Sequence, residues 1–353
     1  MSGRPRATTA ATCSSPAASA RLRPAFSIIR ARVIPNSSII SRSTSTIWAT
    51  LNHGTESRLA DVKFIAATVG WTLVSLVRVV DVRVPIFQVD AFASAVFAGN
   101  PAAVCPLESW LEEGVMQSIA AENNLSETAF FVPEGDGYRL RWFTPTTEVD
   151  LCGHATLASA FVIFTRLDPE RDAVTFDTRS GPLSVTQAGD RLSMDLPALP
   201  PRPVDPPAGL VGALGGSPVE VLGAGRGYLA VYGEEQEVRD LEPDMGALMG
   251  IDHLGAITTA PGTDYDCVSR CFAPRAGIPE DPVTGSAHCT IAPYWADRLG
   301  TSRINAFQAS ERGGEVDCEC VGDRVRLSGS CVLYMTGSIE VASHVPARPA
   351  QAT

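Results

Sequence analysis

Two segments of the chain follow one pattern of residues, and this repetition constrains the fold more than any other feature. The first reads RWFTPTTEVDLCGHATLASAFVIFTRL over residues 141–167, and the second reads RCFAPRAGIPEDPVTGSAHCTIAPYWADRL over residues 270–299. Each contains Phe-x-Pro, a short loop, a Gly and, thirteen residues after that Gly, an Arg-Leu pair. The loop is three residues longer in the second copy, and loops are where duplicated units accept insertions. The sequence therefore predicts an internal duplication.

Each copy ends in a strongly apolar stretch of helical length, residues 155–167 and 287–299. A helix that is apolar nearly all round must be buried. The remaining chain is dominated by short runs rich in β-branched and aromatic residues, several of which end in Gly or Pro, and such runs are typical of strands. We therefore expect an α+β fold with two pseudo-symmetric halves, each a β-barrel-like sheet wrapped around one central apolar helix.

The domain boundaries follow from changes in composition. The organised part begins at about Val84, with the predicted strand VPIFQVDAF, and residues 111–123 have helical spacing. The proline-rich run at residues 196–210 cannot form a helix interior or a central strand, because proline lacks the backbone donor. We expect five regions: an extension (1–83), a first half (84–200), a linker (201–210), a second half (211–345) and a tail (346–353).

The N-terminal extension differs in kind from the rest of the chain. It holds no acidic residue before His53, whereas Arg, Ser and Thr are abundant, a composition typical of an organellar transit peptide. A disordered tail and a misassigned start are the alternatives. We expect a cytoplasmic protein, with a mitochondrial or other organellar location as the alternative. The apolar run at residues 64–77 is shorter than the roughly 20 residues of a membrane span, so we expect no membrane association.

Charge and cysteine content exclude several classes of function. Residues 84–353 carry 17 basic and 36 acidic side chains, and so acidic a body argues against nucleic-acid binding. The nine cysteines include no Cys-x-x-Cys pair and no Cys/His set at zinc spacing. We therefore expect reduced thiols and no metal site.

The starts of the two apolar helices are the first candidate binding elements. Unpaired N–H groups at a helix N-terminus favour anions, so two such termini facing one cleft, at Gly153 and Gly285, favour a substrate that carries a carboxylate. Ser286 occupies the position of His154 in the repeat. Its hydroxyl or N–H group either faces the same ligand or caps the helix.

Three further residues are candidates for acid–base chemistry. Glu127, in NNLSETAFF, enters an apolar strand, where partial burial would raise its pKa; the alternative is a solvated acid at a helix end. His154 follows the Gly of the first repeat and is either a proton shuttle or a structural histidine. Asp281 lies in Pro-Glu-Asp-Pro and is either a rigid partner for His154 or a turn residue.

Cys152 precedes Gly153 and is a candidate thiolate base. Its counterpart in the second copy is Thr284, so the pair of thiols that a two-base racemase needs is absent. An amino-acid racemase or epimerase that depends on Cys152 is one alternative function. A catalytically silent binding or scaffold protein is the other.

Four motifs, in order, carry a resemblance to a known family: FQVDAFASAVFAGNPAAV, NNLSETAFF, FTPTTEVDLCGHAT and IPEDPVTGSAH. Over roughly residues 84 to 345, the chain resembles the phenazine-biosynthesis isomerase-like (PhzF-like) family. The resemblance implies the diaminopimelate-epimerase-like fold, with the active site between the halves. The implied catalytic residues are Glu127, His154 and Asp281, and the implied substrate-binding residues are Asn100, Gly153, Gly285 and Ser286.

The resemblance also implies a reaction. The family isomerises trans-2,3-dihydro-3-hydroxyanthranilate by moving a proton from one ring carbon to another, without a metal or an organic cofactor. We therefore expect an isomerase that uses no cofactor, takes a small carboxylate-bearing substrate and forms a homodimer.

Overall fold

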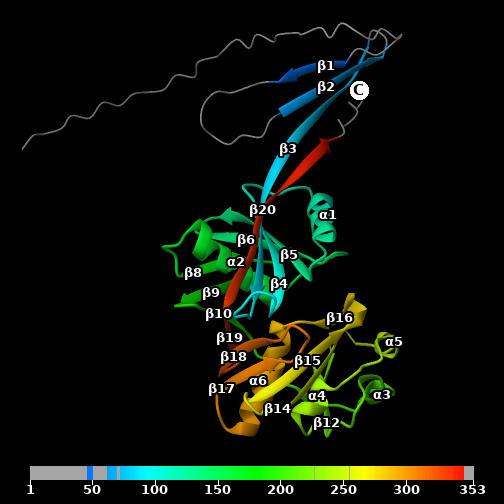
Figure 1. Cartoon of the computed structure of the whole chain (residues 1–353), viewed down its shortest axis with the longest axis vertical. Helices are drawn as coiled ribbons and strands as arrows, with labels where there is room; N and C mark the ends of the chain where they lie inside the picture. Colours follow the sequence, from blue (N-terminus) through cyan, green and yellow to red (C-terminus); the bar gives the residue numbers. More distant parts are fainter. Residues whose placement is uncertain (1–45, 51–61, 70–71, 226, 254, 346–353) are drawn as a thin grey trace, which may run out of the picture. The chain divides into compact units, whose positions relative to one another are not determined.

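The computed structural model describes residues 46–50, 62–69, 72–225, 227–253 and 255–345 (Figure 1). The chain divides into two units, Met1–Asp81 with Ser343–Thr353, and Val82–Ala342. The first unit contains β1 (Thr46–Thr50), β2 (Val62–Val69) and the start of β3 (Thr72–Ala91), and β2 pairs antiparallel with both other strands. In the described part of the chain, no helix is long and apolar enough to cross a membrane.

The first half of the larger unit surrounds helix α2 (Gly153–Val162), which continues as a π-helical turn, Ile163–Leu167. Every α2 residue except Gly153 and Phe161 is buried, as the apolar sequence predicts. Helix α1 (Glu113–Asn123) packs on the outside of the sheet. The strands that follow β3 are β4 (Asn100–Pro106), β5 (Glu127–Glu134), β6 (Gly137–Phe143), β7 (Glu148–Val149), β8 (Ala173–Asp177), β9 (Leu183–Ala188) and β10 (Arg191–Pro197).

The second half surrounds helix α6 (Gly285–Leu299) in the same manner. Its strands are β11 (Arg202–Pro203), β12 (Glu220–Ala224), β13 (Gly227–Val231), β14 (Ala256–Pro261), β15 (Cys267–Ala273), β16 (Ile278–Asp281), β17 (Arg303–Gln308), β18 (Gly314–Val321) and β19 (Arg324–Gly329). Its short helices are α3 (Leu210–Leu214), α4 (Glu235–Arg239), α5 (Met245–Met249) and a 3₁₀ turn, Pro274–Ala276.

The strand pairings show that the halves are pseudo-symmetric. In the first half the order is β3-β4-β5-β6-β8-β9-β10, and the successive pairs are antiparallel, parallel, antiparallel, parallel, antiparallel and antiparallel. In the second half the order is β12-β13-β14-β15-β17-β18-β19, with the same series of directions. Each central helix enters at the same point, after β7 or β16. The predicted fold class is therefore confirmed.

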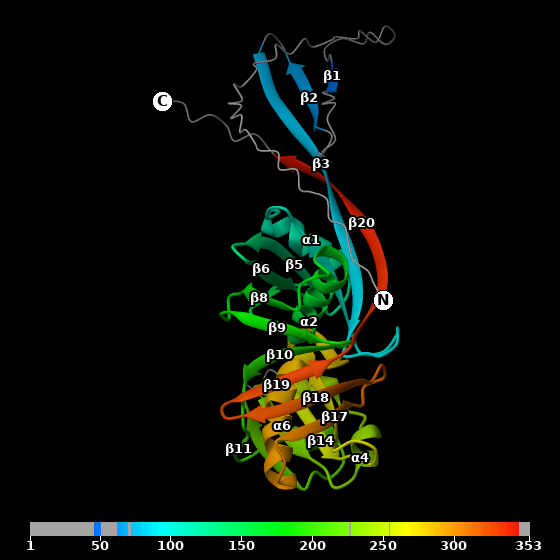
Figure 2. The same cartoon turned by 90° about the vertical axis from the view of Figure 1, so that its left-hand side faces the viewer.

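The two sheets are joined through their last strands. β10 pairs antiparallel with β19, from Leu192 opposite Gly329 to Pro197 opposite Arg324 (Figure 2). β20 (Cys331–Val345) then runs back beside β3, where Ile339 and Val341 pack against the first half. One hydrophobic core includes both central helices and the inner faces of both sheets.

Proline 293 lies inside α6, where a proline normally leaves one carbonyl without its helical partner. The carbonyl that loses its donor belongs to Cys289, four residues earlier. The backbone N–H of Leu199, in the proline-rich run after β10, donates to this carbonyl at 2.8 Å. The proline-rich run therefore supplies the hydrogen bond that Pro293 removes from the helix.

An ion pair connects the halves at the loop between β3 and β4. Arg312, in the loop before β18, donates to the buried carboxylate of Asp90 at 2.9 Å and to the carbonyls of Ala98 and Gly99 at 3.0 and 2.8 Å. The second oxygen of Asp90 accepts from the N–H of Phe97 at 2.9 Å. The side chain of Asp90 is only 2% exposed, so these hydrogen bonds offset the cost of burying its oxygens.

We expect the change Arg312→Met to lower the free energy of unfolding by about 3 kcal/mol, because it leaves a buried carboxylate without its counterion. Urea denaturation measures this loss. The matched control is Arg303→Met, which removes an exposed ion pair with Glu319 and should cost less than about 1 kcal/mol. Equal losses in the two variants would show that the Arg312 pair is no stronger than a surface contact.

Candidate active site

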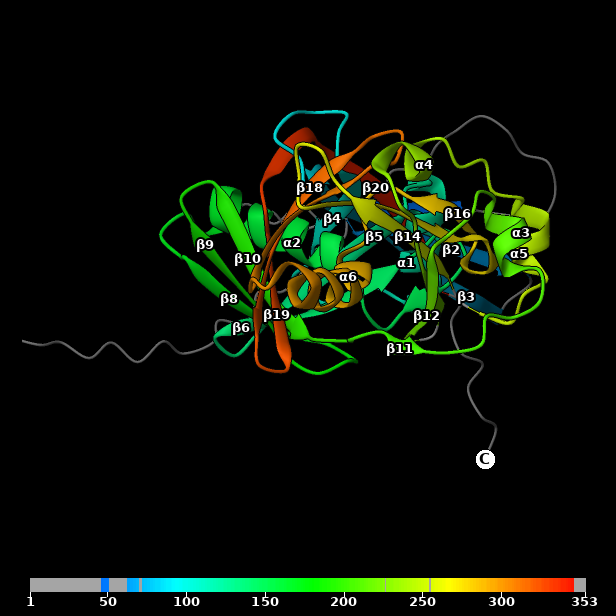
Figure 3. The same ribbon diagram turned by 90° about the horizontal axis from the view of Figure 1, so that it is seen from below.

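The N-termini of α2 and α6 approach each other closely at Gly153 and Gly285; Figure 3 shows the two helices from below, with α6 in front of α2. A Cβ atom built on either Gly153 or Gly285 would lie 3.6 Å from the Cα atom of the other, so the two backbones are in contact. Neither helix has a side-chain cap on its first turn, because Cys152 and Thr284 make no such hydrogen bond. These turns therefore present uncapped N–H groups, which favour a bound anion.

Ser286 is the second residue of α6, and its side chain is exposed. The N-cap position belongs to Thr284, so the alternative that Ser286 caps the helix is wrong. Its hydroxyl is free to face a ligand beside the two glycines.

Glu127 and His154 lie together next to these helix ends. Glu127 begins β5 and His154 is the second residue of α2; their side chains are only 10% and 5% exposed. Oε2 of the glutamate lies 3.3 Å from Nε2 of the histidine. Within the described residues, neither atom has a hydrogen-bond partner. Two polar atoms that face each other in a buried place, without other partners, are suited to exchange a proton with a third group.

The local sequence explains how Glu127 reaches this place. Helix α1 ends at Asn124, which adopts a left-handed conformation (φ 50°) and donates its N–H to the carbonyl of Ala120 at 3.1 Å. The chain then turns into β5, where Ala102 of β4 lies beside Glu127 in parallel pairing. Glu127, the first residue of β5, is therefore buried inside the first half.

Burial sets the protonation of this pair. Burial and, to a smaller extent, the charge of Asp281 together raise the pKa of Glu127 to about 8. Burial lowers the pKa of His154 to about 3, so the imidazole is neutral at physiological pH. Near neutrality the glutamate therefore exists in both protonation states beside a neutral histidine, as general acid–base catalysis requires.

Asp281, at the end of β16, joins the site from the second half. Its carboxylate accepts from Asn100 Nδ2 at 2.7 Å and from Thr284 Oγ1 at 2.6 Å. Burial raises the pKa of Asp281 to about 6, although these two hydrogen bonds oppose the rise. The same Asn100 amide donates to the carbonyl of Val283 at 2.9 Å. Asn100, expected to bind substrate, therefore holds the loop that carries Asp281, and only its Oδ1 atom is without a partner among the described residues.

A buried glutamine that the sequence analysis did not identify completes this loop. Gln308, on β17, accepts from the N–H of Thr284 at 2.8 Å and donates to the carbonyl of Asp281 at 2.6 Å. Gln308 and Thr284 are 24 positions apart in the sequence and are brought together by the parallel pairing of β15 with β17. No local sequence pattern could have revealed this contact. Thr284 itself was visible, as the counterpart of Cys152 in the repeat.

Comparison with known proteins connects this site to a family. The family model for phenazine biosynthesis-like proteins (PhzC-PhzF) matches residues 89–337. This chain belongs to that family. An uncharacterized isomerase of Pseudomonas aeruginosa is 52% identical over 256 residues, which cover 72% of this chain and 98% of the relative. All of the predicted site residues lie within the matched segment, and the extension lies outside it.

Solved structures confirm the fold of this phenazine biosynthesis-like protein. A PhzF-family protein of Enterococcus faecalis is 46% identical, with a TM-score of 0.72, and covers 74% of this chain and all of its own. A predicted epimerase of Pseudomonas aeruginosa matches with a TM-score of 0.57 at 22% identity, over 72% of this chain and 99% of its own. The second likeness concerns the fold alone, and it agrees with the expected diaminopimelate-epimerase-like architecture.

In this member of the family, two arginine–glutamate pairs occupy equivalent places in the halves. Arg141 on β6 makes two hydrogen bonds to Glu148 on β7, both 2.7 Å long. Arg270 on β15 makes two to Glu280 on β16, at 2.8 and 2.9 Å. Such paired contacts fix both position and orientation. Because Glu280 precedes Asp281, the second pair anchors the strand that carries the candidate acid.

Cys152 contacts the same site but is a poor base. Its Sγ atom lies 3.5 Å from His154 Nδ1. Burial raises the pKa of the thiol well above its ordinary value, and the charge of Glu127 adds to the effect. Cys152 therefore remains a thiol near neutral pH, whereas a nucleophilic or basic cysteine needs a thiolate.

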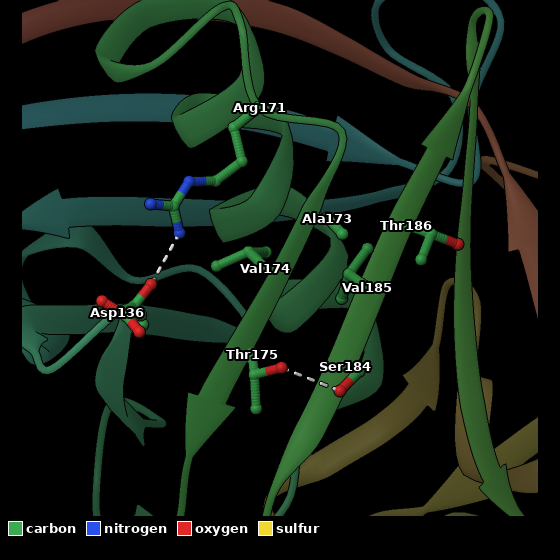
Figure 4. A pocket seen from close by; sticks show the side chains of 9 residues that line it. Asp136, Arg171, Ala173, Val174, Thr175, Ser184, Val185 and Thr186 are labelled. Carbon is green, nitrogen blue, oxygen red and sulfur yellow. Dashed lines mark hydrogen bonds between the residues drawn. The ribbon is translucent and has the colours of Figure 1, made fainter.

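A shallow pocket of about 300 Å³ lies elsewhere, on the outer side of the first half (Figure 4). β8 and β9 line it, and its polar groups are paired locally: Arg171 donates to the carbonyl of Asp136 at 2.8 Å, and the hydroxyls of Thr175 and Ser184 lie 3.0 Å apart. It contains no predicted site residue and no carboxylate beside a histidine. Its chemistry does not make it a catalytic site, so the helix ends are the candidate active site.

Proposed function

We propose that this protein is a cofactor-independent isomerase that moves a proton between two carbons of a small carboxylate-bearing substrate. The reaction is similar to that of trans-2,3-dihydro-3-hydroxyanthranilate isomerase. The observation that carries the proposal is the buried contact of Glu127 and His154 beside the meeting helix ends. The curated relative of Pseudomonas aeruginosa, 52% identical, is itself named an isomerase.

The helix ends supply the binding part of the site. The substrate carboxylate binds to the first-turn N–H groups of α2 and α6, whose backbones approach each other closely at Gly153 and Gly285. Ser286 adds a hydroxyl from the exposed side. The substrate is therefore anionic and small, and the carbons that exchange the proton lie toward Glu127.

The proposed reaction needs only proton transfers. Ionised Glu127 removes a proton from one carbon; the electron pair of the broken C–H bond shifts into the substrate's π system, and the same carboxyl group returns the proton to another carbon. Neutral His154, whose Nε2 lies 3.3 Å from Oε2 of Glu127, keeps the carboxyl group oriented. Asp281, held by Asn100 and Thr284, supports the transfer through its charge, which helps to raise the pKa of Glu127 and so favours the protonated acid that returns the proton. No electron is gained or lost overall.

Deuterium uptake tests this function. The full chain is incubated in deuterated water with dihydro-hydroxyanthranilate and a panel of small amino and hydroxy acids. Mass spectrometry then records deuterium at carbon-bound positions. Uptake by one compound would support proton-transfer catalysis and identify the substrate class. Ligand-induced thermal stabilisation tests the alternative of a silent scaffold, which should ignore all of these carboxylates.

We expect the change Cys152→Ser to retain deuterium exchange within about tenfold, because the buried thiol is protonated and Glu127 supplies the base. Exchange kinetics on the responsive substrate measure the effect. Alkylation of Cys152 is a weaker test of its role. The adduct would lie against His154 and could block the site even if the thiol takes no part in the reaction. Loss of activity to the level of an inactive protein would instead support the alternative of a Cys152-dependent racemase.

A further inference from the structure

Three side chains in the site offer different donor atoms to one point. Glu127, Cys152 and His154 each have a ligand atom (a carboxylate oxygen, a sulfur and an imidazole nitrogen), and these atoms all lie within 4.8 Å of one another. All three residues are buried. Glu127 comes from β5, whereas Cys152 and His154 come from the start of α2, so the fold and not a local motif brings the set together.

The unpartnered atoms show where a ligand would sit. Oε2 of Glu127 and Nε2 of His154 face each other at 3.3 Å, and neither has a hydrogen-bond partner among the described residues. Two ligands of one tetrahedral metal ion are separated by about this distance, since metal–oxygen and metal–nitrogen bonds are each about 2.1 Å long. The Cys152 sulfur lies 3.5 Å from the other ring nitrogen of His154, and it is the third donor atom of the group whose members lie within 4.8 Å of one another.

The chemistry of the three donors selects the cation. Thiolate, imidazole and carboxylate are the ligands of zinc, and catalytic zinc sites use three protein ligands with a fourth position left open. Mg²⁺ and Ca²⁺ prefer oxygen ligands and would gain little from the sulfur and nitrogen. The thiol and any protonated carboxyl group release their protons to water as the cation binds, without a redox step.

We propose that Glu127, Cys152 and His154 form a binding site for Zn²⁺ or another thiophilic divalent cation, and that the bound cation inhibits the protein. Binding removes Glu127 and His154 from proton transfer, so this inhibition rests on the proposed isomerase function. The cation site itself does not, because it depends only on the three donors.

Cadmium is the probe for binding, because a cadmium–thiolate bond gives an ultraviolet charge-transfer band. Cd²⁺ is titrated into the reduced full chain without substrate, and equilibrium dialysis counts the bound ions. We expect one tight site per chain, a thiolate band, displacement by Zn²⁺ and no displacement by Mg²⁺. The change Cys152→Ser should remove the band and weaken binding at least tenfold. Glu127→Gln should weaken binding but keep the band.

The matched controls are Cys320→Ser and Cys331→Ser, which remove thiols of two half-buried residues outside the three-donor group. Both should retain the band and the affinity of the unchanged protein. A band that survives in Cys152→Ser, or that disappears in either control, would overturn the proposal. So would equal displacement by Mg²⁺ and Zn²⁺.

The ratio of deuterium-exchange rates with and without Zn²⁺ then separates the two proposals. The unchanged protein should lose nearly all exchange at saturating Zn²⁺, and the two control variants should lose as much. Binding at Cys152 without any loss of exchange would confirm the cation site and contradict the catalytic role of Glu127. If the protein exchanged deuterium without metal but bound no Cd²⁺, the isomerase proposal would be supported and the cation-site proposal would be wrong.

Discussion

Replacing Glu127 with glutamine is expected to lower deuterium incorporation at carbon by about 10²- to 10⁴-fold, the usual contribution of a positioned acid–base group. An amide can neither take nor return the proton. Glutamine has almost the shape of a protonated glutamate, which is the main form that burial favours here. The loss should therefore appear in the rate of exchange rather than in the folding of the protein, and mass spectrometry with the responsive substrate measures it.

The same strand provides the control. Glu134 ends β5 and is exposed, so Glu134→Gln makes the identical chemical change away from the helix ends. It should exchange deuterium at the rate of the unchanged protein. If Glu127→Gln kept full activity on a substrate that the protein turns over, Glu127 would not be the base, and Asp281 would be the next candidate.

The central helices show what could be predicted from sequence. Their apolar character identified two buried helices, at residues 155–167 and 287–299, and the observed helices end close to those limits. Both begin two residues earlier, because Gly153 and Gly285 adopt helical conformation directly after an extended residue. No feature of the sequence indicated that α2 would end in a π-helical turn.

The acid–base residues could be predicted because each stands in a local pattern. Glu127 marks the change from polar to apolar sequence, His154 stands at the helix start, and Asp281 lies in the loop that is longer in the second copy. Their assignments remain predictions until the variants are tested. What sequence alone could not provide is the 3.3 Å contact between Glu127 and His154, which depends on how β5 packs against α2.

Long-range partners were the main omission. The expectation that Asn100 binds substrate stays a prediction, and nothing in the sequence indicated that its amide group also donates to Asp281 and Val283 in the other half. Gln308 supports the same loop from β17. Both roles depend on strand register and on the contact between the halves, which no spacing in one chain reveals. The return of β20 to β3 is a further example, since residues 331–345 lie in the expected second half but run beside a strand of the first half. Most of the predicted extension and all of the tail lie outside the described residues.

The second large effect expected of Glu127→Gln concerns stability and its dependence on pH. Burial raises the pKa of Glu127 from 4.5 to about 8. The folded protein therefore keeps a proton that the unfolded chain releases, so the stability this group contributes is complete below pH 4.5 and is lost as the pH rises toward 8. Each pH unit in this interval corresponds to about 1.4 kcal/mol. Relative to the unchanged protein, the glutamine variant should gain a few kcal/mol between pH 5 and pH 8, measured by urea denaturation at each pH.

The Glu134→Gln variant shows whether this gain belongs to the site, since an exposed carboxylate should change stability by the same small amount at both pH values. His154 is neutral and buried in both proteins, so its own loss of stability on acidification should largely cancel in the comparison. A constant difference between Glu127→Gln and the unchanged protein would mean that Glu127 is ionised in the folded state throughout this range. The site would then lack the protonated acid that returns the proton to carbon. A growing difference would show that the fold gives up stability to keep a carboxyl group with a pKa suited to proton transfer.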